Sequence, residues 1–212
     1  MIAASYHKTG TILLKNIFMD IYKNSQSKYT FSYWFWKIKN EQIKKNKCVV
    51  IIRHPYEIIC SGMRYHQVAK EPWLDVPNIK YDNMSYKDKL KSMDNVDDKI
   101  LFEMNHTAYD TINYMYNDIK NRNFNNNIYL LKLEDLYDIN NLPKICSDIC
   151  RIINDKTITY DIIYKAFVKN LKRNFHRTNQ ENSHTFPQLF KDIHYDEFNK
   201  LFPKDTMEVI GY

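Results

Sequence analysis

Five consecutive β-forming residues, Cys48-Val49-Val50-Ile51-Ile52, contain no polar side chain. Alternate side chains of a strand point to opposite faces of the sheet, so this run would expose apolar groups if either face met water. The pattern is typical of a central strand in a parallel sheet that is covered on both faces. The chain must therefore supply helices for both sides of a sheet, which favours an α/β fold.

Other segments alternate between strand-like and helix-like patterns. Strands are predicted over residues 1–6, 29–36, 48–52 and 128–133, and helices over 11–22, 55–66, 97–120, 142–153, 158–171 and 195–202. Pro55 fits the first turn of its helix, where its missing N–H costs nothing. Residues 38–47 are predicted as a solvated helix or loop, 72–77 as a loop docked by Trp73 and Leu74, and 172–191 as a polar loop. We expect one domain, residues 1–212, with a central, mostly parallel sheet flanked by helices.

Composition narrows the class of protein. A hydrophobic fraction of 44% excludes a disordered chain, and a net charge of +6 favours anionic ligands. The four cysteines form no CxxC pair, so buried, reduced thiols are expected. No run reaches the roughly 18 apolar residues of a membrane span, and a cytoplasmic location is expected. The lysine-rich residues 37–47 are better explained by a solvated face than by nucleic-acid binding.

The join between the first strand and the first helix reads His7-Lys8-Thr9-Gly10-Thr11. Gly10, one of 3 glycines in the chain, allows the main chain to approach an anion, while Lys8 adds charge and the two threonines add hydroxyls. The N–H groups of the first turn, which includes Ile12, point toward such a ligand. A helix start capped by threonine is the alternative. The GxxxxGK[ST] spacing of a nucleoside-triphosphate loop is absent.

A second polar cluster follows the strand over residues 48–52. Arg53 stands at the strand end, and Ser61 follows eight residues later on the predicted helix. A guanidinium can bind two phosphate oxygens at once, and a serine hydroxyl can add a further bond. Because ligands of open parallel sheets bind at the carboxyl ends of the strands, both clusters are candidates for contact with an anionic ligand. Taken alone, Arg53 is better explained by a surface ion pair.

Together these segments resemble the sulfotransferase family. Lys8-Thr9-Gly10-Thr11 is similar to its 5′-phosphosulfate loop, and the spacing from Arg53 to Ser61 is similar to its 3′-phosphate segment. Two weaker segments, Leu130 to Leu136 and Phe198 to Tyr212, agree in order. The resemblance implies a P-loop-NTPase-like sulfotransferase architecture.

It also implies the reaction and the ligands. A sulfuryl group would pass from 3′-phosphoadenosine 5′-phosphosulfate (PAPS) to a hydroxyl or amine of a small-molecule or carbohydrate acceptor, leaving 3′-phosphoadenosine 5′-phosphate (PAP), without a metal. Lys8 would stabilise the charge on the bridging oxygen. Tyr109, Trp73 or Phe175 would help to hold the adenine. A basic segment near the C-terminus would close over the 3′-phosphate, with Lys172, Arg173, His176 and Arg177 as its candidates.

The general base stays open. The family places a His or a Glu between its two phosphate segments, whereas residues 9–52 contain no histidine and only two carboxylates, Asp20 and Glu41. Glu41 lies in the lysine-rich segment, where a solvated surface role explains it better than catalysis. The candidates are His7, beside the loop, His66, at the end of the helix after Arg53, and His106. A catalytically inactive nucleotide-binding protein of the same fold and a small-molecule kinase are the alternative functions. The sequence indicates neither the acceptor nor the oligomeric state.

Overall fold

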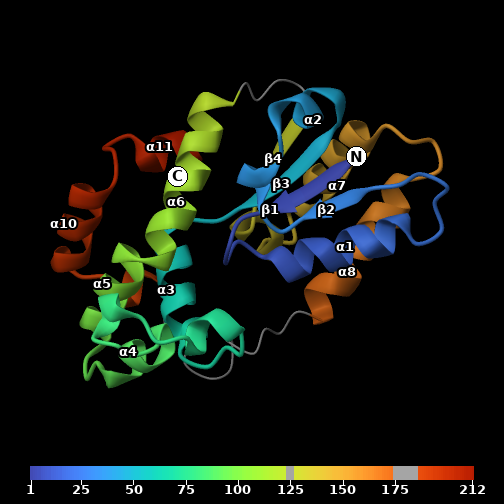
Figure 1. Cartoon of the computed structure of the whole chain (residues 1–212). Coiled ribbons are helices and arrows are strands. Elements are labelled where there is room, and N and C mark those ends of the chain that lie inside the picture. The colour runs from blue at the N-terminus through green and yellow to red at the C-terminus, as the bar shows by residue number, and fades with distance from the viewer. Residues whose placement is uncertain (123–126, 174–185) are drawn as a thin grey trace. The chain divides into compact units, whose positions relative to one another are not determined.

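The computed structural model describes residues 1–122, 127–173 and 186–212 (Figure 1). The chain divides into two compact units. The sheet unit comprises residues 1–54 and 114–175, and the helical unit comprises residues 55–113 and 176–212. The single domain over residues 1–212 stays a prediction.

The sheet unit is built on four parallel strands. They are β1 (Ile2–Ser5), β2 (Thr30–Ser32), β3 (Cys48–Ile52) and β4 (Ile128–Lys132), in the order β2-β1-β3-β4. The register pairs Ala4 with Val50 and Val50 with Leu130. A strand is thus confirmed in each of the four predicted segments, but β2 is shorter than the predicted residues 29–36, because the chain leaves the sheet after Ser32. Strand β3 lies between β1 and β4, as a central strand does.

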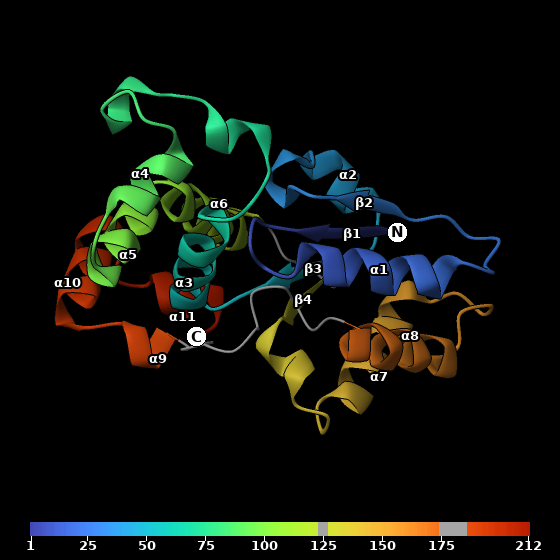
Figure 2. The same cartoon turned by 90° about the horizontal axis from the view of Figure 1, so that it is seen from below.

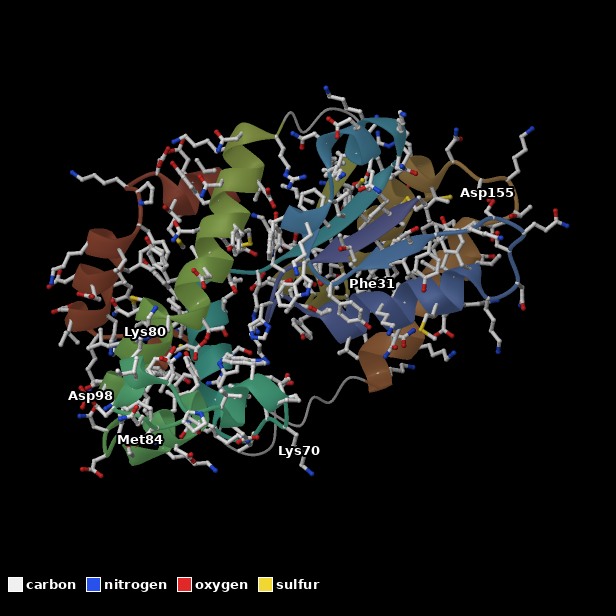
Figure 3. All side chains as sticks on the ribbon, in the orientation of Figure 1. Phe31, Lys70, Lys80, Met84, Asp98 and Asp155 are labelled. Carbon is white, nitrogen blue, oxygen red and sulfur yellow. The ribbon has the colours of Figure 1, made fainter. Side chains whose placement is uncertain are left out.

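Three helices cover one face of this sheet. They are α1 (Thr11–Tyr22), α7 (Leu142–Ile153) and α8 (Tyr160–Arg173), which lie together beside the strands in Figures 1 and 2. Ala3, Val49 and Leu131 point from the strands into the core that these helices complete. Phe31 of β2, labelled in Figure 3, packs against the same core. The apolar faces of the three amphipathic helices therefore pack against the apolar face of the sheet.

The opposite face of the sheet is also buried. Ala4 and Val50 alternate with the residues named above and have no exposed surface. Past the end of β1, the ring of Tyr6 packs edge-on against Phe35 of the short helix η1 (Phe35–Lys37), at a centroid distance of 5.9 Å. Helix α2 (Asn40–Lys45) follows η1, and η4 (Glu134–Tyr137) follows β4. Burial on both faces confirms the prediction from residues 48–52.

The remaining elements belong to the helical unit or cross into it. They are α3 (Pro55–His66), η2 (Pro72–Asp75), η3 (Ile79–Tyr81), α4 (Tyr86–Ser92), α5 (Val96–Asn105), α6 (Thr107–Asn121), α9 (Phe186–Leu189), α10 (Asp192–Leu201) and α11 (Thr206–Ile210). The boundary between the two units falls within α6. Helix α3 begins at Pro55, as predicted. Leu74 of η2 is fully buried, whereas Trp73 is partly exposed. None of the helices in the described ranges has the length and apolar character needed to span a bilayer.

The single helix predicted over residues 97–120 is wrong. The chain leaves helical geometry at His106, with φ −128° and ψ −104°, so that α5 and α6 are separate helices. The His106 Nδ1 lies 2.7 Å from the Phe102 carbonyl oxygen, and the two rings pack at 4.3 Å. The side chain competes for a carbonyl of the helix, which ends α5 although the apolar spacing continues.

Candidate functional site

The strand order places the loops after β1 and β3 at a switch point of the sheet. From β1 the chain first moves to β2 on one side, and later reaches β3 on the other side. The connections leave in opposite directions there, which opens a crevice at the carboxyl ends of the strands in folds of this class. Lys8 follows β1 and Arg53 follows β3, so the first predicted cluster and Arg53 of the second lie at this position.

The turn after β1 is closed by its own side chains. The Thr9 hydroxyl donates to the Tyr6 carbonyl (2.9 Å) and accepts from the Tyr6 N–H (3.1 Å), and the Thr11 hydroxyl donates to the same carbonyl (3.1 Å). Thr9 is completely buried. Its hydroxyl therefore shapes the turn from inside, and contact of the Thr9 side chain with a ligand stays a prediction.

Two residues of this turn have left-handed main-chain geometry. Lys8 has φ 61° and Gly10 has φ 96°. The first hydrogen bond of α1 runs from the Leu14 N–H to the Gly10 carbonyl (3.0 Å), so the N–H groups of residues 11–13 lie before the hydrogen-bonded ladder. The first turn of α1 contains no acidic residue and has no side-chain cap. Such a helix start favours an anion, both through its N–H groups and through the helix dipole.

Gly10 is also required by packing. A Cβ atom at this position would lie 2.9 Å from Cδ1 of Leu133 and 3.1 Å from Cδ1 of Ile51. The turn thus rests directly on the side chains of β3 and of the residue that follows β4. Only glycine satisfies both the positive φ and this close approach.

Arg53 joins the two clusters. Its Nη1 donates to the Lys8 carbonyl oxygen at 3.1 Å. The next residue, His54, donates its main-chain N–H to Oε1 of Glu134 at 3.0 Å, which fixes the chain after β3 to the chain after β4. A cationic side chain thereby lies against the turn that was predicted to bind phosphate, and both belong to the sheet unit.

The base of the turn is anchored to α6. Tyr6 donates its hydroxyl to Oδ2 of Asp118 at 2.9 Å, and the Nε of Arg122 lies 2.6 Å from Oδ1 of the same carboxylate. Burial raises the pKa of Asp118, while Tyr6 and Arg122 oppose that rise. Burial, followed by the Asp118 charge, raises the pKa of the Tyr6 phenol, so the phenol stays protonated and donates.

The other predicted residues of the sheet unit differ in exposure. Ile12 is half exposed, so its main chain rather than its side chain suits a phosphate contact. The His7 ring stacks on Trp34, with centroids 6.1 Å apart and planes at 19°. Residues 174–185, Arg177 among them, lie outside the described residues. Among the described residues, no three histidine, cysteine or acidic side chains are grouped as metal ligands are.

Four predicted residues lie in the helical unit. Ser61 is buried on α3, and His66 ends the same helix with no exposed surface. The Nδ1 of His66 lies 2.9 Å from Oε2 of Glu103, which also accepts the Tyr86 hydroxyl at 2.8 Å. His106 caps α5, and Tyr109 packs against Phe202 at 5.5 Å. Their roles at a ligand stay predictions.

Sequence reasoning missed several residues that hold the site together. Glu134 lies within a segment noted for its family resemblance, and its bond to the main chain after β3 gives that segment a physical role. Asp118 and Arg122 carry no motif. The aromatic run over residues 29–36 predicts a strand, whereas its second half leaves the sheet and brings Trp34 against His7.

Neither a family model nor a curated protein matches the sequence. Among solved structures, mouse sulfotransferase SULT7A1, complexed with PAP, is similar over 99% of this chain and 86% of its own, with a TM-score of 0.60 and 13% sequence identity. A four-stranded parallel sheet flanked by helices, with the sulfotransferase architecture that the sequence predicted, is therefore confirmed for this chain.

Proposed function

We propose that this chain is a sulfotransferase that transfers the sulfuryl group of PAPS to a hydroxyl or amine acceptor. The observation that carries the proposal is the bond from Arg53 to the Lys8 carbonyl, which joins an anion-binding helix start to a cationic side chain at the switch point. The sequence resemblance and the shared fold support the same function. PAP in the mouse structure is a ligand of that protein, and its binding here is part of the proposal.

Each group of the loop has a role in this proposal. The N–H groups at the start of α1 and the Lys8 ammonium bind the 5′-phosphosulfate. Negative charge grows on the bridging oxygen as the sulfur–oxygen bond breaks, so both stabilise the transition state more than the bound donor. Holding donor and acceptor in line lowers the barrier further.

The residues that bind the rest of PAPS are proposed from the resemblance to the sulfotransferase family. We propose that Arg53 and Ser61 bind the 3′-phosphate, that Tyr109 contacts the adenine, and that Arg177 closes over the phosphate. Arg53 suits the role because it follows β3, bonds to the turn after β1, and carries a guanidinium, which can bind two phosphate oxygens at once.

Ligand-induced thermal stabilisation tests the binding step. PAP should raise the melting temperature more than ATP at equal concentration, because a ligand that binds only the native state stabilises it by mass action. Arg53→Met should strongly reduce the rise in melting temperature that PAP causes, and Arg53→Lys should reduce it less. Lys8→Met should lower turnover more than it lowers this rise. Lys144→Ala and Arg151→Ala, which remove exposed cations of α7, are the matched controls.

Turnover with labelled PAPS and phenol, carbohydrate and amine acceptors tests the reaction. A larger rise in melting temperature with ATP than with PAP would favour the alternative function, a small-molecule kinase. A PAP shift without transfer to any acceptor would favour an inactive nucleotide-binding protein. Equal effects of the Arg53 and Arg151 variants would refute the site.

A further inference from the structure

One buried carboxylate of the sheet unit has no assigned role in the proposed reaction. Asp118 lies on α6, and 8% of its surface is exposed. Burying a carboxylate is unfavourable unless hydrogen bonds or an opposite charge compensate for the lost hydration. Both of its oxygens are compensated: Oδ2 accepts the Tyr6 hydroxyl at 2.9 Å, and Oδ1 accepts the Arg122 Nε–H at 2.6 Å. These two partners lead to different parts of the sheet unit.

Arg122 holds the carboxylate in place. Its Nη1 donates to the Ile38 carbonyl oxygen at 2.7 Å, and its Nη2 donates to the Trp36 carbonyl oxygen at 3.0 Å. The same guanidinium lies 5.0 Å from the centroid of the Phe35 ring. Because a guanidinium is planar and rigid, these contacts fix its orientation and, with it, the position of the carboxylate that it bonds.

The spacing of residues along α6 produces this arrangement. Tyr114, Asp118 and Arg122 follow one another at intervals of four, so they share one face of the helix. The Arg122 N–H donates to the Asp118 carbonyl at 2.9 Å, which continues the helical pattern past Asn121. Tyr114 stacks on Trp36, with centroids 4.4 Å apart and planes at 13°. This face of α6 therefore packs against the segment that follows β2.

Tyr6 connects the carboxylate to the turn after β1. Its main-chain carbonyl accepts the hydroxyls of Thr9 and Thr11, and its N–H donates to the Thr9 hydroxyl. The main chain of the turn is thus closed on this one residue. Among the described residues, the Tyr6 phenol forms a hydrogen bond with Asp118 alone.

The second buried carboxylate in the described ranges has no such connection. Glu103 lies on α5 and interacts with His66 and Tyr86, all of them in the helical unit. Asp118 differs from it, because one of its partners carries the turn that was predicted to bind phosphate.

We infer that Asp118 is a positioning residue for PAPS, which sets the place of the phosphate-binding turn through the Tyr6 phenol; this inference rests on the proposed function. The N–H groups at the start of α1 must point at the phosphosulfate, and a misplacement of about 1 Å can lower a rate about 100-fold. A carboxylate held by Arg122 is a fixed point for Tyr6, so the turn keeps one position. Asp118 need not touch PAPS to act in this way.

Substitutions that remove one bond at a time test the inference. Tyr6→Phe removes only the phenol oxygen. Asp118→Asn keeps the shape of the side chain but leaves one acceptor oxygen for two donors. Each variant should raise the Kd for PAP about 10-fold in a calorimetric titration, because the turn must then be ordered on binding. Each should also lower kcat about 10-fold in the transfer assay with labelled PAPS.

The double variant separates positioning from general stability. If the phenol acts through the carboxylate, Tyr6→Phe should add little in an Asp118→Asn background, and the Kd for PAP should stay within about twofold of that of Asp118→Asn.

Asp155→Asn, at a position labelled in Figure 3, is the matched control. This carboxylate also accepts several hydrogen bonds in the sheet unit, from Ser27 and Thr157. Ser27 precedes β2, whereas the turn follows β1, so the control lies at the opposite end of the parallel strands. It can lower the melting temperature of the free protein but should leave the Kd for PAP within about twofold of the wild-type value.

The outcomes separate the inference from the proposed function. A wild-type chain that binds PAP and transfers sulfuryl groups, with Tyr6→Phe and Asp118→Asn within twofold of its Kd and kcat, would overturn the inference alone. Fully additive effects of the two substitutions would show that phenol and carboxylate act separately, and would also overturn it. Tyr6→Phe decides by itself if Asp118→Asn does not fold, and the Kd values decide if PAP binds without transfer. A wild-type chain that neither binds PAP nor transfers would refute the proposed function and the inference with it.

Discussion

Replacing Gly10 by alanine should destabilise the protein by about 2–5 kcal/mol, with two physical contributions. The first is conformational. Gly10 has φ 96° and ψ 29°, and an L-residue in this region costs about 1–2 kcal/mol.

The second contribution is packing. The new Cβ would lie 2.9 Å from Leu133 Cδ1 and 3.1 Å from Ile51 Cδ1, closer than carbon atoms normally pack. Both side chains are buried, so they can move only by disturbing the core, and an extra methyl in such a site costs about 1–3 kcal/mol.

Urea unfolding of wild type and variant measures the sum, and Gly211→Ala separates its parts. Gly211 ends α11 with φ 99° and ψ 30°, nearly the geometry of Gly10. Gly211→Ala should carry a similar conformational cost, so the additional loss of stability in Gly10→Ala measures the cost of packing. That comparison requires each variant to unfold in a single transition.

A double-mutant cycle with Leu133→Val can refute the reasoning. The shorter side chain removes the atom that lies closest to the new methyl, so Gly10→Ala should be less costly in that background by about 1 kcal/mol. Strictly additive effects, or a Gly10→Ala variant as stable as wild type, would show that the turn does not rest on Leu133 as described.

Two further predictions concern the helical unit. Gly62→Ala should destabilise the protein by about 3 kcal/mol or more, because the new Cβ would lie 2.2 Å from Oε1 of Glu103, which is buried and hydrogen-bonded. A free energy of unfolding in urea within about 0.5 kcal/mol of the wild-type value would contradict this prediction. His194 should make the protein less stable as the pH falls. Burial lowers the pKa of its imidazole, although the charge of Asp97 opposes this shift, and its Nδ1 accepts a hydrogen bond from the Lys191 N–H. The unfolded chain then binds the proton more readily, so stability is complete above the ordinary histidine pKa of about 6.5 and declines as pH falls through and below that value. Thermal melts from pH 8 to 5 should show a smaller loss for His194→Asn, and equal losses would refute the assignment.

Local patterns predicted most of the fold. Helix α1 spans Thr11–Tyr22 and α3 spans Pro55–His66, as predicted, because apolar spacing, a glycine before the first helix and a proline at the start of the second lie within the segments themselves. The apolar run of β3 predicted burial on both faces, and side chains of both faces, Val49 and Val50 among them, have no exposed surface.

What the sequence could not supply depends on contacts between distant residues. Arg122 donates to the Ile38 carbonyl across a separation of 84 residues, and no local pattern indicates that bond. The end of α5 was missed because the His106 side chain, not a helix-breaking residue, interrupts an apolar repeat that continues on both sides. The same holds for the candidate site: the sequence indicated its motifs, but not the hydrogen bonds that fix their geometry.

The turn after β1 shows why its motif has residues that do not themselves face a ligand. Left-handed geometry is unfavourable for Lys8, which has a side chain, and persists only where the surroundings enforce it, whereas Gly10 adopts it freely. Thr9 bonds Tyr6 from inside, and Arg53 bonds the Lys8 carbonyl from β3. These bonds lie within the chain itself and hold the main chain from which α1 begins, and a turn that is held by its own bonds loses less ordering entropy on binding than a loose one. Thr9 and Arg53, both predicted from a phosphate motif, thus bond to the main chain of the turn and fix its shape, whatever they contact besides.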